Sequence, residues 1–293
     1  MFDFRYHAIS LVAVLVALVV GVLLGVAIGD AGLVSSAEQN LRADLREDVG
    51  RAQDRVADLE SKLAEQRRSA GRFEDATYPL LVGGRLEGRR VALVFLGMPS
   101  RKVRDSVSDA LEETGGRLTG TLGVREAPDV EALAKAAGDS RYAGLGNDPE
   151  LLEEFGRRIG VQLFQGGKLL RSEAKALFST RAGSVGPFEG VVVARNPSKG
   201  LTDEERARAD ALENGIIKGL TETPGFAAGV ERSGSTPSQV PWYRKRGLTS
   251  VDNVDETAGK AALVFGLSGA EGSFGRGPLA ESLLPAPEAV GVG

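Results

Sequence analysis

The chain has 293 residues, a hydrophobic content of 42%, and 36 basic against 40 acidic side chains, for a net charge of −4. This length suits one or two globular domains, and the near balance of charge excludes a generally basic nucleic-acid-binding protein. Cysteine is absent and His7 is the single histidine, which excludes disulfides, zinc–thiolate sites, cysteine nucleophiles, and a three-histidine zinc site or Ser-His-Asp triad within one chain.

The first segment, residues 1–30, is a predicted transmembrane anchor. Residues 8–28 are apolar except for Ser10, and a helix of that length spans roughly 30 Å, the thickness of a bilayer core. A retained anchor is favoured over a cleaved signal peptide, for which Ala27-Ile28-Gly29 would be the cleavage site. Arg5 before the helix and Asp30 after it favour a cytoplasmic N-terminus, with the rest of the chain outside.

Small residues recur every fourth position of this segment. Such a stripe lets two helices approach closely in lipid and predicts packing against a second copy or another helix, although glycine and alanine are also common in membrane helices. The candidate packing residues are Ala13, Ala17, Gly21, Gly25 and Gly29.

Residues 31–75 form a predicted coiled-coil stalk. Apolar residues alternate at spacings of four and three, which is the pattern of a heptad seam. Leu45, Ala52 and Leu59 occupy d positions, and Val49, Val56 and Leu63 occupy a positions. The alternative is a single amphipathic helix on its own domain. Together with the small-residue stripe, the seam favours a homo-oligomer of undetermined strand number.

Residues 76–270 alternate between apolar strands and amphipathic helices, which predicts a three-layer α/β domain with a mainly parallel sheet. The predicted strands are residues 89–97, 118–124, 188–196, 226–231 and 261–267. The predicted helices are residues 100–113, 129–137, 149–159, 168–177 and 201–220, the last with Thr202 and Glu205 as a capping box. We expect residues 271–293 to be a Gly/Pro-rich flexible tail that is disordered over 285–293.

The α/β domain carries no enzyme signature. The turn after the first strand has one glycine where a dinucleotide fingerprint needs three, and no P-loop is present. The glycines after residue 265 could cradle a phosphate, but a flexible linker is favoured. The oxygen-rich group around Asp252 and Asp255 could bind a cation, yet turns and helix caps are the favoured role. Residues 241–247, PWYRKRG, could meet an anionic surface or form a solvated basic loop.

Three stretches give a family resemblance. Residues 2–11 read FDFRYHAISL and lead into the apolar helix, and the charged helix that follows is the second stretch. The third is residues 240–267, VPWYRKRGLTSVDNVDETAGKAALVFGL, followed by the glycine-rich EGSFGRG. This arrangement resembles the actinobacterial copper-transport outer-membrane proteins of the MctB family. The specific motif is Val251, Asp252, Asn253, Val254 and Asp255. The resemblance implies copper efflux or homeostasis at the cell envelope, by an oligomeric pore that limits intracellular copper.

The metal-ligand inventory opposes a copper cage within one chain. Copper prefers sulfur and imidazole ligands, and His7 and Met98 are the only candidates apart from the initiating methionine. We therefore expect no bound cofactor, with copper at most a transported ion. The alternatives are a non-enzymatic envelope scaffold that recruits a protein partner, and an enzyme using Asp252 or Asp255. The family name implies the outer membrane, whereas an uncleaved apolar helix favours the inner membrane.

Overall fold

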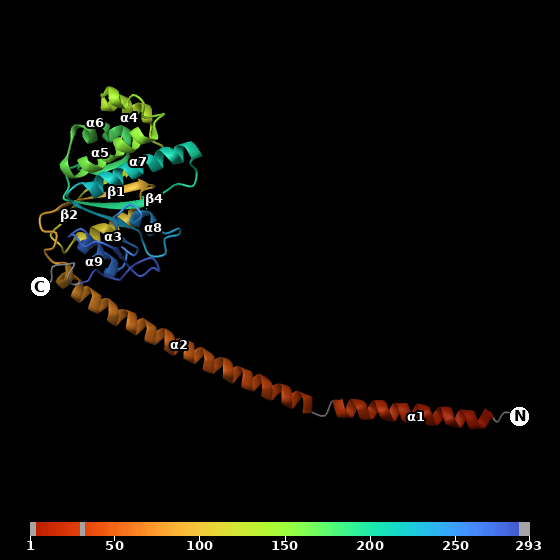
Figure 1. Cartoon of the computed structure of the whole chain (residues 1–293). Helices are drawn as coiled ribbons and strands as arrows, with labels where there is room; N and C mark the ends of the chain where they lie inside the picture. Colours follow the sequence, from red (N-terminus) through yellow and green to blue (C-terminus); the bar gives the residue numbers. More distant parts are fainter. Residues whose placement is uncertain (1–3, 30–32, 287–293) are drawn as a thin grey trace. The chain divides into compact units, whose positions relative to one another are not determined.

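The computed structural model describes residues 4–29 and 33–286, and the chain divides into two units, Met1–Gly71 and Arg72–Gly293. The first unit is helical. It contains α1 (Phe4–Gly29) and most of α2 (Leu33–Val82), which are drawn in red and orange in Figure 1. The second unit holds the end of α2 and the sheet domain.

Helix α1 confirms the predicted apolar helix. Its segment Tyr6–Ile28 has a mean hydropathy of 3.2 and is fully exposed, so it is long and apolar enough to cross a membrane. A Cβ atom added at Gly21 or Gly25 would meet nothing within 4 Å. The small-residue stripe is therefore open along α1, and its predicted packing partner stays a prediction.

Helix α2 carries the predicted heptad seam on an exposed face. Leu45, Val49, Val56, Leu59 and Leu63 are all about half exposed or more. Ion pairs such as Lys62 Nζ to Asp58 at 2.8 Å stabilise the single helix locally. The helix continues to Val82, beyond the expected stalk end at residue 75, and the coiled coil itself stays a prediction.

The second unit contains one seven-stranded sheet with the order β3-β2-β1-β4-β5-β6-β7. All neighbouring strands are parallel except β3, which is antiparallel to β2. The strands are β1 (Arg90–Gly97), β2 (Arg117–Val124), β3 (Phe178–Gly183), β4 (Gly190–Asn196), β5 (Phe226–Val230), β6 (Thr249–Val251) and β7 (Ser273–Phe274). The chain moves outward from β1 to β3 and then returns to the other side of β1 as β4.

Helices cover both faces of the sheet, which confirms the predicted three layers (Figure 1). Along β1, Ala92, Val94 and Leu96 join one core cluster, and Val91 and Leu93 join the other. The first cluster lies under α4 (Val130–Ala137), the 3-10 helix η1 (Ser140–Tyr142), α5 (Pro149–Gln165), α6 (Lys168–Leu177) and α7 (Asp203–Glu222). The second lies under α3 (Arg101–Leu111) and α9 (Thr257–Gly266).

The predicted strand at residues 261–267 is wrong, because residues 261–266 form the second half of helix α9 and Leu267 caps its end. Every residue from Ala261 to Gly266 is buried, so the run lacks the polar face by which a helix is identified. The helix also begins earlier, at Thr257, which the apolar run does not reveal. Strands β6 and β7 form the edge of the sheet where the last strand was expected. They have only three and two residues, too few for an alternating sequence pattern to reveal them.

The expected flexible tail from residue 271 also needs correction. Ser273 and Phe274 form β7, which pairs with β6. The backbone N–H groups of Arg276 and Gly277 donate to Asp252 at 3.0 and 2.8 Å. The ordered domain therefore extends past residue 277, while the disorder predicted for residues 285–293 falls mostly outside the described residues.

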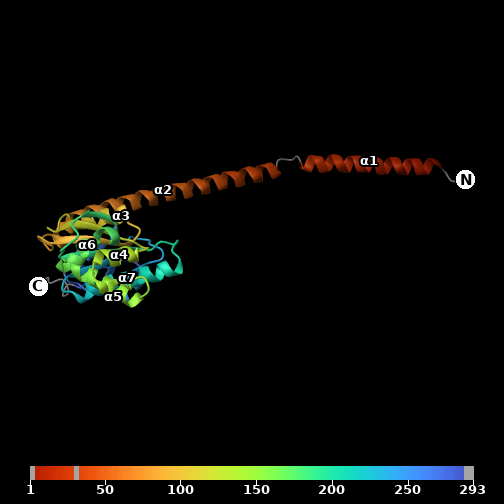
Figure 2. The same ribbon diagram turned by 90° about the horizontal axis from the view of Figure 1, so that it is seen from above.

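Helices α5 and α7 run side by side in both views (Figures 1 and 2) and approach closely through glycines. A Cβ atom on Gly215 would lie 2.0 Å from the carbonyl oxygen of Glu153, and one on Gly219 would lie 2.0 Å from that of Arg157. On α5, a Cβ atom on Gly160 would lie 2.2 Å from the carbonyl oxygen of Ile216. Backbone atoms cannot move aside like flexible side chains, so each position requires glycine.

We expect Gly215→Ala to lower the free energy of unfolding by about 2–3 kcal/mol, since the added methyl group overpacks the α5–α7 contact. Unfolding of the full chain in detergent can be followed by the fluorescence of the single tryptophan. Gly144→Ala is the matched control, because its Cβ atom would meet only Leu151 at an ordinary 3.7 Å. Equal stability of the two variants would contradict this account of the contact.

Candidate functional site

The main candidate site lies between β1 and β4, where the order of the strands along the chain reverses, and outside the carboxyl ends of these two strands. Strands on the two sides of such a switch point are followed by helices on opposite faces, which leaves a crevice where ligands commonly bind in α/β proteins. A cavity of about 410 Å³ opens here. It is lined by residues following β1, β4 and β5, among them Met98, Asn196, Lys199 and Arg232.

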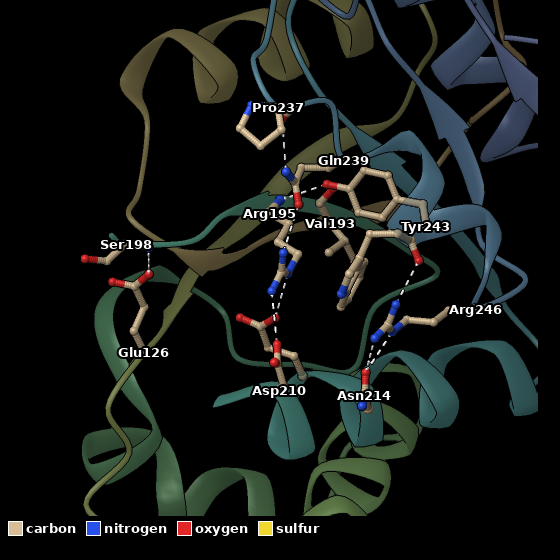
Figure 3. A network of polar contacts seen from close by, with 12 residues as sticks. Glu126, Val193, Arg195, Ser198, Asp210, Asn214, Pro237, Gln239, Tyr243 and Arg246 are labelled. Carbon is tan, nitrogen blue, oxygen red and sulfur yellow. Dashed lines mark hydrogen bonds and ion pairs between the residues drawn. The ribbon is translucent and has the colours of Figure 1, made fainter. Parts of the chain in front are cut away.

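Arg195, at the end of β4, anchors the polar network beside this cavity (Figure 3). Its guanidinium donates to Glu213 at 2.7 Å and Asp210 at 3.2 Å, both on α7, and to Gln239 at 2.9 Å. Glu213 is almost fully buried, and this burial raises the pKa of its carboxyl group although Arg195 opposes the shift. A buried carboxylate requires a charged partner. Arg195 is that partner for Glu213, and the ion pair holds α7 against the sheet.

Residues 241–247 lie in the short helix α8 (Val240–Arg244) and in the turn that follows it, and Arg244 and Lys245 are exposed as in the predicted solvated basic segment. The Trp242 ring is flanked by two guanidinium groups, Arg195 at 4.7 Å and Arg246 at 3.9 Å from its centroid. Arg246 also donates to Asn214 Oδ1 at 2.7 Å (Figure 3). Both guanidinium groups therefore stabilise the domain through cation–π contacts.

Tyr243 is fully buried and joins β4 to β5. Its hydroxyl group accepts a hydrogen bond from the backbone N–H of Arg195 at 2.8 Å (Figure 3). The same hydroxyl group lies 3.2 Å from the carbonyl oxygen of Val230. Burial raises the pKa of this phenol well above its usual value. The ring fits because Gly229 has no side chain; a Cβ atom there would lie 2.5 Å from it.

The motif Val251–Asp255 has a structural role, because its side chains bond to two neighbouring loops. The Val251 and Val254 side chains are fully buried, and Asp252 accepts the two N–H groups of the segment after β7. Asp255 accepts the N–H of Ser233 at 2.7 Å and a guanidinium N–H of Arg232 at 3.0 Å. Although partial burial opposes ionisation, these donors hold the pKa of Asp255 below its usual range.

The remaining motif residue, Asn253, lies at the start of α9. Its side-chain amide donates to Glu256 Oε2 at 3.2 Å, and a Cβ atom on Gly259 would lie 1.9 Å from its carbonyl oxygen. The two motif carboxylates are thus bonded to turns, whereas the buried Oδ1 atom of Asn253, beside the cavity of about 390 Å³, has no hydrogen-bond partner among the described residues. This arrangement favours the turn and helix-end role over a cation site.

Glu231, which follows β5, lies between the switch-point cavity and a second cavity of about 390 Å³ and lines both. It is 7% exposed and accepts hydrogen bonds from Ser238 Oγ at 2.7 Å and Gln239 N at 2.5 Å. Burial raises the pKa of its carboxyl group. The sequence marked neither Glu231 nor Glu213, because a single acid at the end of an apolar stretch reads as an exposed residue.

The two predicted metal candidates lie in different units of the chain. His7 lies in α1 of the first unit, and Met98 follows β1 in the second and is 56% exposed. Over residues 4–29 and 33–286, no group of three or more His, Cys, Asp or Glu side chains has the arrangement of a metal site. Asp252 and Asp255 accept hydrogen bonds from protein groups instead.

One family model matches nearly the whole chain. It is described as a copper transport outer membrane protein, MctB, and it covers residues 1–285. The match includes both long helices, the sheet and the Val251–Asp255 motif. A comparison with curated proteins gives no match.

We expect Tyr243→Phe to lower the free energy of unfolding by about 2 kcal/mol, because the buried N–H of Arg195 loses its acceptor. Trp242 is the neighbouring residue and reports the transition by fluorescence. Tyr142→Phe is the matched control, since the hydroxyl group of that buried tyrosine is bonded to Arg158, which water can reach. A loss no larger than that of the control would contradict the proposed link between β4 and β5.

Glu231→Gln should change how stability depends on pH. An acid whose pKa is raised by folding binds more protons in the folded than in the unfolded chain, so it makes stability fall as pH rises between the usual and the raised pKa. The wild-type chain should therefore gain stability relative to Glu231→Gln as the pH is lowered from neutral through that window. Urea titrations at several pH values measure the difference, with Glu60→Gln on exposed α2 as control. A constant difference would refute the buried carboxyl account.

Proposed function

Because the chain belongs to the MctB family of copper transport outer membrane proteins, we propose that it acts in copper efflux and copper homeostasis at the cell envelope. The observation that carries this proposal is the match over residues 1–285, which includes both the apolar helix and the folded domain. In this proposal α1 is a retained membrane anchor and the α/β domain lies outside the cytoplasm. The role is not enzymatic.

Copper is then a transported ion and not a resident cofactor. Its preferred ligands are thiolate, thioether and imidazole groups, and this chain offers almost none of them. The acidic residues near the cavities are bonded to backbone N–H groups and to arginines. These observations support an indirect role, in which the chain supports a transport pathway and does not store the metal.

The proposal also requires assembly, since one apolar helix cannot enclose a pathway for ions. Two open surfaces support a homo-oligomer: the small-residue stripe of α1 and the exposed heptad seam of α2. Small residues allow close helix packing in lipid, and a heptad seam favours pairing in water. The family name indicates the outer membrane, whereas a retained apolar helix suits the inner membrane, and we favour the inner membrane on that physical ground.

A second candidate is a non-enzymatic envelope scaffold that recruits a protein partner for envelope assembly or division. The lack of a metal-like cluster among the described side chains favours it. The commitment of Arg195 and Asp255 to the domain's own contacts favours it too. In this case α1 and α2 would hold the α/β domain at the membrane, and copper levels would not depend on the protein.

Deletion of the gene should raise cellular copper, and the wild-type gene should restore both copper content and tolerance. We expect the double variant His7→Ala, Met98→Leu to restore them equally well, because the two residues form no described metal site. Metal content is measured by mass spectrometry, with zinc in the same cells as the control for general envelope damage. Unchanged copper in the deletion strain would overturn the copper proposal, and failure of the double variant alone would identify direct ligation.

A further inference from the structure

We propose that the α7 cavity, a space of about 430 Å³ lined by Arg246, Lys245 and Lys218, binds the phosphate group of a phosphate monoester. The monoester is either a soluble compound or a lipid headgroup, since both present the same group. This inference goes beyond the proposed copper role and does not rest on it.

The α7 cavity opens where the second half of α7 meets α5 and the turn after α8. Its lining residues are Glu153, Asn214, Lys218, Thr221, Lys245 and Arg246. The three from α7 are separated by four and three residues, so they share one face of that helix. Arg246 is fixed against this face, because its guanidinium donates twice to Asn214 Oδ1 (Figure 3). Side chains from three separate parts of the domain thus meet at one cavity.

The α7 cavity carries an excess of positive charge. Lys218 lies 3.6 Å from Glu153, with both side chains about half exposed, so this pair is weak. Lys245 is exposed, and its side chain has no hydrogen bond or ion pair within residues 4–29 and 33–286. Three cations against one acid leave an excess of two positive charges. A phosphate monoester carries nearly two negative charges at neutral pH, so it suits this excess better than a carboxylate does.

Arg246 is a partly buried charge without a carboxylate partner. Its guanidinium donates to Asn214 Oδ1 at 2.7 Å and to the carbonyl oxygen of Trp242 at 3.1 Å, and it lies 3.9 Å from the centre of the Trp242 ring. These partners are neutral, and the described part of the chain forms no ion pair with Arg246. Burial and the nearby charge of Arg195 lower the pKa of the Arg246 guanidinium. Since buried charges in proteins are normally paired, a bound phosphate group would supply the missing counter-charge.

Two further acids on α7 act on Arg246 from a distance. The charges of Asp210 and Glu213 oppose the lowering of its pKa. Both carboxylates are paired with Arg195, at 3.2 and 2.7 Å, and neither lines the α7 cavity. They therefore leave its positive excess without a partner at contact distance.

An adjoining cavity of about 360 Å³ restricts where the ligand lies. It shares Glu153 and Lys218 with the α7 cavity. Its other lining residues are Glu150, Glu154 and Arg157. Three acids against two cations make this adjoining cavity negative, so it repels a phosphate group. The ligand is therefore expected on the side of the turn after α8.

Trp242 is the single tryptophan and reports binding, because its ring contacts Arg246. The full chain in an uncharged detergent is titrated with glycerol phosphate at constant ionic strength. We expect a saturable change in fluorescence, and no saturation with sodium acetate under the same conditions. A response to glycerol phosphate that does not saturate, or an equal response to acetate, would overturn the proposal.

Two variants test the residues in opposite directions. Lys245→Gln should weaken glycerol phosphate binding about tenfold, because one charge-assisted contact is lost. Glu153→Gln should strengthen it about threefold, since the acid that repels phosphate is removed. A gain in affinity cannot arise from misfolding.

The matched control is Lys102→Gln, which removes the same charge from an exposed position on α3, at the other face of the sheet. Its affinity should equal that of the wild type. Equal affinities of Lys245→Gln and Lys102→Gln would overturn the assignment of the site, and so would a loss of affinity in Glu153→Gln.

A second probe, dihexanoyl phosphatidic acid, carries the same phosphate group on a lipid and is titrated below its micelle concentration. Equal affinities for the two probes support a soluble phosphate compound as the ligand. At least about tenfold tighter binding of the lipid supports a headgroup. In both cases Lys245→Gln must weaken binding, and saturation by neither probe would refute the phosphate site.

Discussion

The hydrogen bonds of the buried Tyr243 hydroxyl group are the interaction on which the sheet domain depends. They join β4 to β5 just beyond the point where the strand order reverses, at the place where parallel strands begin to diverge. The neighbouring Arg195 extends the link to α7 through Glu213, and Trp242 is held between Arg195 and Arg246. One short helix, α8, thereby ties two strands and a covering helix together. Many α/β proteins bind their ligands at this place, and in this chain a cavity of about 410 Å³ remains there beside the contacts of Arg195.

The side chains of the Val251–Asp255 motif likewise contact other groups of the same domain. The motif carboxylates accept hydrogen bonds from backbone N–H groups and from Arg232, and the motif valines lie in the core. A motif that identifies the family thus acts by closing the sheet edge, where β6 and β7 are too short to be stable by strand pairing alone. A copper-related role does not need these residues to touch metal.

Sequence patterns predict the long apolar strands and the helices that have a polar face or specific signals at their ends. Strands β1 and β4 are long apolar runs between turns, and Thr202 with Glu205 marks the start of α7 by a capping box that the structure contains. Helix α9 was mistaken for a strand because it is buried on every side and so has no polar stripe. Strand β3 was missed for the opposite reason, since nearly all of its side chains are exposed at an edge. Neither Glu231 nor Arg195 could be recognised, because their roles depend on neighbours that are distant in the sequence.

Helix α2 has two apolar faces near its end, and the domain covers only one of them. Tyr78 and Val82 satisfy the domain core, while Phe73 and Leu80 are exposed. Large apolar side chains left this exposed cost solubility unless a partner covers them. A helix that belonged only to the domain would need one apolar face, and a helix that served only as a spacer would need none. The two faces together show that the end of α2 serves the domain core with one side and leaves an apolar surface open on the other.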